Sequence, residues 1–238
     1  MGDFGKAMFK YLNSRISVII ATLNEEEGIG PTLSEFQKFL PKSQFIVVDG
    51  RSLDRTVEIA KDLDAEVIVQ AGEGKGDALS LGIKHIRPTV RYVVFADGDY
   101  TYPAEYVPKM LEVLEQNRSV GMVIGNRFNG EHNFDKSISN LFYVGNRFLA
   151  FAQNLLNGVD LEDPLSGLRV VRASILKDWR PKSKGFDVEA EINFQVERAG
   201  YKIVEIPIRY RRRLGEKKLK MRHGLEIMKR IITESLSM

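Results

Sequence analysis

The sequence lacks cysteine altogether and has only three histidines and one tryptophan in 238 residues. Without cysteine the chain forms no disulfide framework and carries out no thiolate chemistry. The scarcity of histidine leaves Asp, Glu, Arg and Lys as the main side chains available for chemistry. With 43% hydrophobic and 28% charged residues, the remaining composition is typical of a soluble globular protein.

Long apolar runs are also missing, which argues against a membrane-spanning segment. The longest helical candidate, residues 141–156, is interrupted by two pairs of polar residues, whereas a span needs about 20 mostly apolar residues. Residues 1–14 include Asp3, Lys6 and Lys10 and lack the unbroken apolar core of a signal peptide. The sequence shows no internal repeat and no long linker, so we expect one continuous domain over residues 1–238.

The net charge of +3 conceals an uneven distribution. Between Arg209 and Arg230 there are ten Lys and Arg residues but two Glu residues, while the rest of the chain is acidic. A basic end on an acidic body indicates an anionic partner, although a solvated basic helix face has the same signature. Nucleic acid is not the expected partner, because basic charge alone is non-specific and no aromatic stacking platform accompanies it.

Short β-branched runs alternate with helical patterns along the chain. We expect strands at 16–21, 45–48, 67–69, 92–96 and 120–124, and helices at 26–40, 53–63, 76–86 and 104–116, with Ser52 or Asp54 capping the second helix. The second half predicts a helix at 137–157, a strand at 168–171, a helix at 188–198, a strand at 203–208 and a final amphipathic helix with Leu225, Met228, Ile232 and Leu236 on one face. Such alternation is typical of an α/β fold with a mostly parallel sheet and flanking helices. Ligands of such sheets bind beyond the carboxyl ends of the strands.

Two acidic residues one position apart, Asp97 and Asp99, follow an apolar strand directly, with Gly98 between them. Both carboxylates can reach a single hard cation, and Mg²⁺ typically uses one or two protein carboxylates together with water and phosphate oxygens. The glycine lets the backbone turn tightly. The pattern indicates a divalent metal site, and an ordinary acidic turn is the alternative.

Polar residues follow other strands that are expected to end at the same edge. Asp49 could accept hydrogen bonds from a base or a ribose. A carboxylate of Asn24-Glu25-Glu26 could meet the same nucleotide, or merely favour a helix N-terminus. The loop at 72–77 is no P-loop, because Gly and Asp follow Lys75 where a P-loop has Ser or Thr. Its lysine could still reach a phosphate.

Taken in order, these segments resemble family 2 of the glycosyltransferases, and most of all the dolichyl-phosphate mannose synthases and related polyprenyl-phosphate glycosyltransferases. The matching segments are ATLNEEE (21–27), DGRSLDRT (49–56), GKGDAL (74–79), FADGDYTYP (95–103), GNRF (125–128), DPLSGLRVVR (163–172), KGFDVEAE (184–191) and IVEIPIRYRRRLGEKKL (203–219). Each segment alone is weak evidence, but the ordered series over nearly the whole chain is specific. The resemblance implies a GT-A fold, which is a Rossmann-like sheet with flanking helices.

The resemblance also implies roles for individual residues. The nucleotide-sugar would contact Ala21, Leu23, Glu25, Asp49, Lys75, Asp97 and Gly98. Ala21 and Leu23 stand where family members often have Pro and Tyr. A divalent cation, Mg²⁺ or Mn²⁺, would be held by Asp97, Asp99 and Thr101, and the catalytic residues would be Asp99, Arg127, Asp163 and Glu189. The acceptor phosphate would contact Arg127, Arg169, Arg213, Lys217 and Lys218, with the basic segment 211–218 closing over the site.

The implied activity is the inverting, metal-dependent transfer of a hexose from GDP-mannose or UDP-glucose to a polyprenyl or dolichyl phosphate. Residues 1–127 would bind the nucleotide-sugar and residues 128–219 the acceptor. Residues 220–238 would form an amphipathic helix that holds a cytoplasmic protein peripherally on the cytoplasmic face of a membrane. The same helix could instead pack on the core or pair with a second copy in a homo-oligomer.

Other functions remain as alternatives. A sugar hydroxyl as acceptor, in polysaccharide or glycoprotein synthesis, would need a carboxylate base, for which Asp163 and Glu189 are the candidates. A phosphate acceptor needs little base catalysis, because a phosphomonoester is already anionic at neutral pH. A non-catalytic nucleotide-binding module would not explain two acidic clusters together with several Arg residues. A nucleotidyltransferase would carry a glycine-rich basic loop where residues 22–25 stand.

Overall fold

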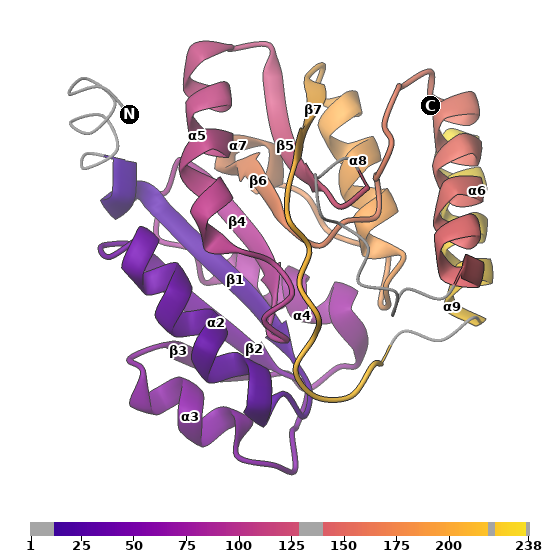
Figure 1. The fold of residues 1–238 in the computed structure, drawn as a ribbon. Helices are drawn as coiled ribbons and strands as arrows, with labels where there is room; N and C mark the ends of the chain where they lie inside the picture. Colours follow the sequence, from indigo (N-terminus) through magenta and orange to yellow (C-terminus); the bar gives the residue numbers. More distant parts are fainter. Residues whose placement is uncertain (1–11, 129–139, 219–221, 237–238) are drawn as a thin grey trace.

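The computed structural model describes residues 12–128, 140–218 and 222–236. Its strands are β1 (Ile16–Thr22), β2 (Gln44–Asp49), β3 (Glu66–Val69), β4 (Tyr92–Asp97), β5 (Val120–Asn126), β6 (Arg169–Arg172) and β7 (Lys202–Pro207). They form one sheet in the order β3-β2-β1-β4-β6-β5-β7 (Figure 1). Neighbouring strands are parallel except at β6, which runs antiparallel to β4 and β5. The prediction of a mostly parallel sheet is confirmed.

Helices cover both faces of this sheet, because the central strands are apolar on both sides. The helices are η1 (Asn13–Arg15), α2 (Glu26–Phe39), α3 (Thr56–Asp62), α4 (Gly74–Lys84), η2 (Ala104–Tyr106), α5 (Val107–Gln116), α6 (Asn140–Asn157), α7 (Ala173–Leu176), α8 (Val188–Arg198) and α9 (Arg222–Ser235). One core cluster lies between the sheet and α2, α3 and α5. The other lies between the sheet and α4, α7 and α8. Since β1, β2 and β5 are buried along nearly their whole length, their ends are the parts available to a ligand.

Most expected elements are confirmed within one or two residues at each end, but α3 begins three residues later than expected. Residues 50–55 form a turn instead, in which Arg51 has a φ of 67° and Ser52 donates a hydrogen bond to Asp49. Neither Ser52 nor Asp54 is the N-cap residue of α3, which is Arg55, but Asp54 Oδ1 accepts the backbone N–H of Thr56, the first residue of the helix. The expected start of a helix at 137 lies outside the described residues. The short η1 and α7 were not expected, because three or four residues carry no periodic pattern.

A two-helix layer, α6 with α9, stands beside α8 at one end of the sheet (Figure 1). Leu149, Ile227 and Ile231 form its small core. On the opposite side of α6, four apolar residues three or four positions apart are exposed, namely Val144, Phe148, Phe151 and Leu155. On α9 the exposed apolar residues include Leu225 and Ile232, and Leu236, the residue after the helix, is exposed as well. Within the described residues, no helix has the length and apolar character needed to cross a membrane.

Candidate active site

The carboxyl ends of β1, β2 and β4 meet at one edge of the sheet. Thr22 is in register with Asp49, and Ala21 with Asp97. The prediction that Asp49 and Asp97 lie at the same edge is therefore confirmed, as the parallel pairing requires. We call the four carboxylates gathered here the acidic edge, which consists of Glu25, Asp49, Asp97 and Asp99.

A strained turn connects Asp97 to Thr101. Tyr100 has a φ of 65°, which is costly for a bulky side chain, and its backbone N–H donates to Thr32 Oγ1 at 3.0 Å. Gly98 does not supply the left-handed residue of this turn. A Cβ at Gly98 would lie 2.8 Å from Thr22 Cγ2, so the glycine is needed for close packing rather than for the turn. This corrects the role expected of Gly98.

Asp99 is nearly buried and is held by Thr101. The Thr101 hydroxyl and backbone N–H donate to Asp99 Oδ1 at 2.6 and 3.2 Å. Burial raises the pKa of Asp99, and the charge of Asp97 raises it further, against the opposing effects of Thr101 and Arg213. Thr101 is only 1% exposed. Its hydroxyl therefore orients Asp99, and the assignment of Thr101 as a metal ligand stays a prediction.

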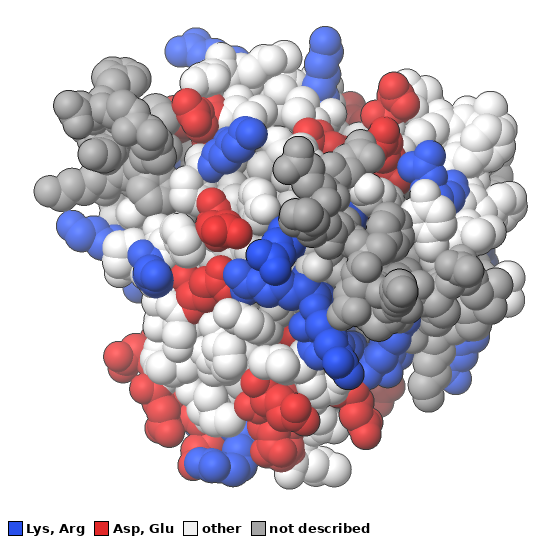
Figure 2. Space-filling model, in the orientation of Figure 1, with Lys and Arg blue, Asp and Glu red and all other residues white. Residues whose placement is uncertain are grey.

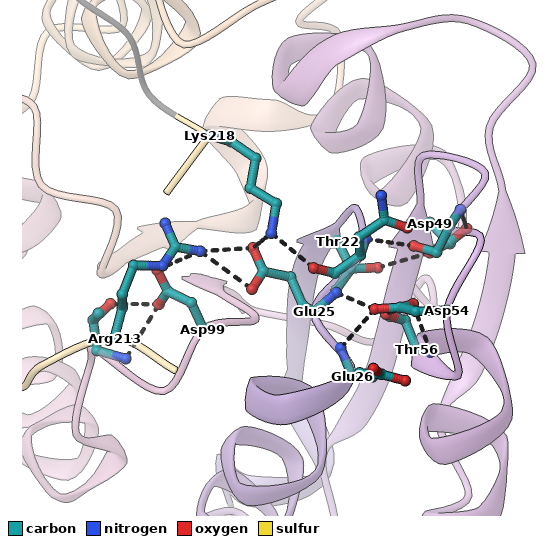
Figure 3. A network of polar contacts seen from close by, with 12 residues as sticks. Thr22, Glu25, Glu26, Asp49, Asp54, Thr56, Asp99, Arg213 and Lys218 are labelled. Atoms are coloured by element: carbon teal, nitrogen blue, oxygen red, sulfur yellow. Dashed lines mark hydrogen bonds and ion pairs between the residues drawn. The ribbon is translucent and has the colours of Figure 1, made fainter. Parts of the chain in front are cut away.

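Asp49 is buried beneath the turn that follows β2. Its Oδ1 accepts the hydroxyls of Thr22 and Ser52, and its Oδ2 accepts the backbone N–H of Ser52 at 2.8 Å (Figure 3). Asp49 is 1% exposed, so a nucleoside would bond to it only by replacing Ser52 or Thr22. The carboxylate therefore shapes the turn next to the expected nucleoside position. Ala21 is partly exposed here, and Leu23 is 43% exposed.

Lys75 joins Asp97 to Glu189. Its Nζ lies 2.5 Å from Asp97 Oδ1 and 2.6 Å from Glu189 Oε1. Burial lowers the pKa of Lys75, but the two carboxylates outweigh this effect, so the pKa lies above its ordinary value and the ammonium stays charged. The second oxygen of Glu189, Oε2, is buried and has no hydrogen-bond partner. Such an oxygen is costly, and a bound hydroxyl group would relieve the cost.

A basic coil crosses the acidic edge. We call residues 208–218, which follow β7, the basic strap. They run across the front of the molecule, where a band of Lys and Arg side chains lies (Figures 1 and 2). Arg213 Nη2 lies 2.9 Å from Glu25 Oε1 and 3.6 Å from Asp99 Oδ2, and Lys218 Nζ lies 2.9 Å from Glu25 Oε1 (Figure 3). The strap thus lies over the site as expected, with protein carboxylates as partners of its cations.

Arg127 follows β5 and forms a buried ion pair with Asp163. Its Nε and Nη2 lie 2.7 and 2.6 Å from the two carboxylate oxygens, and its backbone N–H donates to Oδ2. Both oxygens of Asp163 are therefore engaged, which makes it a poor candidate for a general base.

Burial lowers the pKa of Lys217, and the charges of Arg213 and Arg127 lower it further, so three cations lie close together. A bound anion would relieve their repulsion.

Arg169 does not reach this group of cations. It is 1% exposed, and its guanidinium donates to four protein acceptors, which are the carbonyl oxygens of Pro164, Ser166 and Glu189 and the side chain of Asn193. These bonds fasten segment 164–166 to α8. The assignment of Arg169 to the acceptor phosphate is thereby corrected, and the residue belongs to the scaffold.

Asp97 and Asp99 are the residues whose chemistry fits a divalent cation. The effect of Asp97 on the pKa of Asp99 indicates that their charges lie close together, and Lys75 pairs with only one oxygen of Asp97. In the described part of the chain, no group of three or more His, Asp and Glu side chains is arranged to hold a metal ion. Oxygens of a bound diphosphate would therefore have to complete the coordination shell.

Comparison with known proteins agrees with this arrangement. The model of Glycosyl transferase family 2 matches residues 17–180. The chain belongs to this family. This family 2 glycosyltransferase is 34% identical over 215 residues to Dolichyl-phosphate hexose transferase of Haloferax volcanii. The match covers 89% of this chain and 90% of the relative. It is 29% identical over 219 residues to Undecaprenyl-phosphate mannosyltransferase of Micrococcus luteus, with 86% and 87% covered.

Some relatives are longer than this glycosyltransferase, which spans 62% of Glycosyltransferase AglJ of Haloferax volcanii. Among solved structures, glucosyl-3-phosphoglycerate synthase of Mycobacterium tuberculosis in complex with Mg²⁺ and uridine diphosphate superimposes with a TM-score of 0.75. The match is 21% identical and covers 100% of this chain and 84% of the other. The fold is thus the GT-A fold.

Several further residues build the site, although no sequence pattern marks them. Tyr102 is buried and accepts the backbone N–H of Gly167 at 2.7 Å, behind Asp97. The Arg127 guanidinium lies 5.5 Å from the ring centroid of Tyr210. Glu35, on the third turn of α2, binds Arg211 of the strap. A tyrosine or glutamate inside an apolar pattern gives no signal of its own, because its partner is distant in the sequence.

Proposed function

We propose that this glycosyltransferase moves a hexose from a nucleotide diphosphate-sugar to the phosphate of a polyprenyl phosphate, with inversion at the sugar carbon. The observation that carries the proposal is that Arg213 and Lys218 of the strap lie directly against Glu25 and Asp99 of the acidic edge. Cations next to carboxylates that suit a metal-bound diphosphate offer places for two phosphate groups, one leaving and one attacking. The names of the Haloferax and Micrococcus relatives point to the same acceptor class.

In the proposed reaction, an oxygen of the acceptor phosphate attacks the anomeric carbon of the donor. The bond from that carbon to the diphosphate oxygen breaks, and its electron pair goes to the nucleotide diphosphate. No proton has to be removed from the acceptor, because its phosphate is already an anion. The barrier then depends on the negative charge that develops on the leaving diphosphate, which nearby cations stabilise. Arg213 and Lys218 would provide such cations by exchanging Glu25 for the diphosphate.

Asp97 and Asp99 would hold Mg²⁺ or Mn²⁺ together with the donor. When bound, such a cation acts as a Lewis acid on the diphosphate oxygens. Thr101 keeps the Asp99 carboxylate in place through its two hydrogen bonds. Lys75 keeps Asp97 from rotating by pairing with Oδ1, and Glu189 Oε2 would accept a hydroxyl of the donor hexose.

A sugar hydroxyl as acceptor is the second candidate, and one observation favours it. Glu189 Oε2 has no hydrogen-bond partner, so it could take a proton from an attacking hydroxyl. Lys75 opposes this role, because its ammonium lies 2.6 Å from Glu189 Oε1 and a neutral carboxyl group would lose this ion pair. With Asp163 held by Arg127 on both oxygens, a hydroxyl acceptor lacks a well-placed base.

The layer of α6 and α9 would meet the membrane that carries the acceptor. Phe148 and Phe151 are 62% and 64% exposed, on the side of α6 that faces away from the core. Arg147 and Lys229, on the two helices, are exposed cations that suit an anionic lipid surface. The protein would therefore be peripheral, on the cytoplasmic face. Removing α9 would be a poor test, since Ile227 and Ile231 would leave the core of the layer open.

The test is transfer of a labelled hexose from GDP-mannose or UDP-glucose, with Mg²⁺ or Mn²⁺, to a short polyprenyl phosphate and to soluble sugars. We expect transfer to the lipid phosphate alone. With the same acceptor in anionic vesicles, Phe148→Ser/Phe151→Ser should reduce turnover and vesicle co-flotation about tenfold. Leu53→Ser, at an exposed apolar residue of the turn before α3, is the matched control for vesicle co-flotation. Efficient transfer to a soluble sugar, with none to the lipid phosphate, would overturn the proposal.

A further inference from the structure

Arg211 of the basic strap is bound at a point that lies outside the acidic edge. Its Nη1 lies 2.5 Å from Glu35 Oε2, and its Nη2 lies 2.9 Å from Oε1. This is a two-pronged pair between a planar guanidinium and a carboxylate, the strongest geometry available to an ion pair. The side chains are 26% and 15% exposed, so solvent screens the pair less than it screens a surface pair.

The same arginine covers the strained turn between Asp97 and Thr101. The Arg211 guanidinium lies 4.6 Å from the ring centroid of Tyr100, the residue with a φ of 65°. Its backbone N–H donates to the carbonyl oxygen of Thr101 at 3.0 Å. A cation over an aromatic face is attracted to it. One residue therefore contacts both the helix that supports the turn and the turn itself.

Glu35 of α2 also binds the segment that follows the turn. Its Oε1 also accepts the backbone N–H of Ala104, just after the turn, at 3.2 Å. Three residues earlier on α2, Thr32 Oγ1 accepts the backbone N–H of Tyr100. One turn of α2 thus holds the beginning and the end of the segment 100–104. A conformation as costly as that of Tyr100 persists only where its surroundings fix it in this way.

The strap reaches the carboxylates only beyond this anchor. Two residues after Arg211, Arg213 contacts Glu25 and Asp99, and the backbone N–H of Leu214 donates to the carbonyl oxygen of Asp99. Glu25, the N-cap residue of α2, and Glu35, on its third turn, are ten positions apart, about 15 Å along the helix. The arginines at 211 and 213 therefore reach two separate points of one helix, and the first fixes where the second can go.

We propose that Glu35 and Arg211 are positioning residues for glycosyl transfer. Neither contacts the substrate. Together they clamp the basic strap onto the Asp97–Thr101 turn, so that Arg213 is held over Asp99 and the strap keeps one position relative to the turn. The inference rests on the proposed function for the identity of the reaction. The geometry of the clamp does not depend on which acceptor is used.

The ordinary reading of such a pair is a surface ion pair of little effect. The chain offers a matched example in Arg55 and Glu58, which form a similar two-pronged pair at 2.8 and 3.0 Å with side chains 67% and 56% exposed. That pair lies on α3 and holds neither the strap nor the turn. Glu58→Gln is therefore the control for Glu35→Gln.

The experiment measures tryptic cleavage of the strap and steady-state kinetics on the full-length protein. Glu35→Gln leaves every Arg and Lys of the strap in place, so a change in cleavage reports the conformation of the strap. We expect cleavage between 209 and 218 to accelerate about tenfold, with a donor KM raised about tenfold and a much smaller change in kcat. Arg211→Lys should behave in the same way, because lysine keeps the charge but cannot form the two parallel hydrogen bonds of a guanidinium. Glu58→Gln should match the wild type in every measurement.

A double-mutant cycle separates the clamp from two independent effects. Glu35→Gln/Arg211→Lys, which keeps the cleavage site at 211, should be no worse than either single variant in cleavage rate or donor KM. Thermal unfolding of each variant confirms that the comparison is made on folded protein. Wild-type cleavage and wild-type donor KM in Glu35→Gln and Arg211→Lys would overturn the inference, as would additive effects in the cycle. Failure to glycosylate a polyprenyl phosphate would overturn the proposed function but leave the cleavage and donor-binding results standing.

Discussion

The acidic edge and the basic strap face each other across the site, but they are built in different ways. Asp49 and Asp97 end strands of a buried parallel sheet, so hydrogen-bond ladders fix their positions. Arg213 and Lys218 stand on a coil without regular structure, and ion pairs to Glu25 hold them. The first region is positioned by the backbone and the second by side chains that can change partners.

This difference assigns separate tasks to the two regions. A rigid pair of carboxylates suits a metal ion, which demands fixed geometry. Arg and Lys side chains that are already paired with carboxylates can exchange these partners for phosphate oxygens, because one anionic partner then replaces another. We therefore expect substitutions at the acidic edge to abolish activity, and substitutions on the strap to reduce it only partly.

The largest effect should come from Asp99→Ala. The variant should lose metal-dependent binding of the nucleotide-sugar and about 100- to 1000-fold in turnover, comparable to removing a group that stabilises transition-state charge. The fold should survive, because Asp99 lies beyond the end of β4. Calorimetric titration of the donor with and without Mn²⁺ measures the loss, and circular dichroism checks the fold. Wild-type metal dependence in this variant would show that the acidic edge does not bind the metal.

A sharper comparison sets Arg169→Met against Arg213→Gln. The first should lower the free energy of unfolding by about 3 kcal/mol, because buried acceptors lose their donor. Its remaining folded fraction should keep a normal acceptor KM. The second should leave stability nearly unchanged, since its side chain is 23% exposed and its partners can rearrange. It should raise the donor KM about tenfold, because Arg213 is proposed to exchange Glu25 for the donor diphosphate. The reverse pattern in denaturant unfolding and kinetics would return Arg169 to the phosphate site.

The smallest effect concerns pH. Burial, Arg213 and Arg127 place the pKa of Lys217 below its ordinary 10.5. Binding of an acceptor phosphate needs the protonated lysine, so affinity should fall as the pH rises through this lowered pKa, earlier than an ordinary lysine would allow. In Lys217→Arg the side chain stays charged. The decline in affinity should therefore begin at a higher pH than in the wild type, and between the two pH values the acceptor KM of the two proteins should differ by a few-fold. A pH profile of acceptor KM identical in both proteins would remove Lys217 from the phosphate site.

The predictability of the site follows the same division. Strand ends such as Asp49 and Asp97 could be placed from the sequence, because hydrophobic runs mark the strands and parallel pairing brings their ends together. The partners of Arg127, Arg169 and Arg213 could not be placed, because all three have the same chemistry and only packing decides which is buried. Gly98 was expected to make the turn that Tyr100 makes, since composition favours glycine there and only the contacts of α2 select the tyrosine.

The antiparallel β6 has a consequence for how such enzymes diversify. Its first residue, Arg169, pairs with Phe95 and Ile124 near the carboxyl ends of β4 and β5. The chain therefore leaves the sheet after β5 and returns at the same edge, and residues 127–168 form an excursion whose two ends lie close together. Such an excursion can lengthen, shorten or be exchanged by recombination without altering a strand pairing. An exchange of this kind would leave the carboxylates at the ends of β2 and β4 in place, because the pairings of these strands with β1 lie outside the excursion.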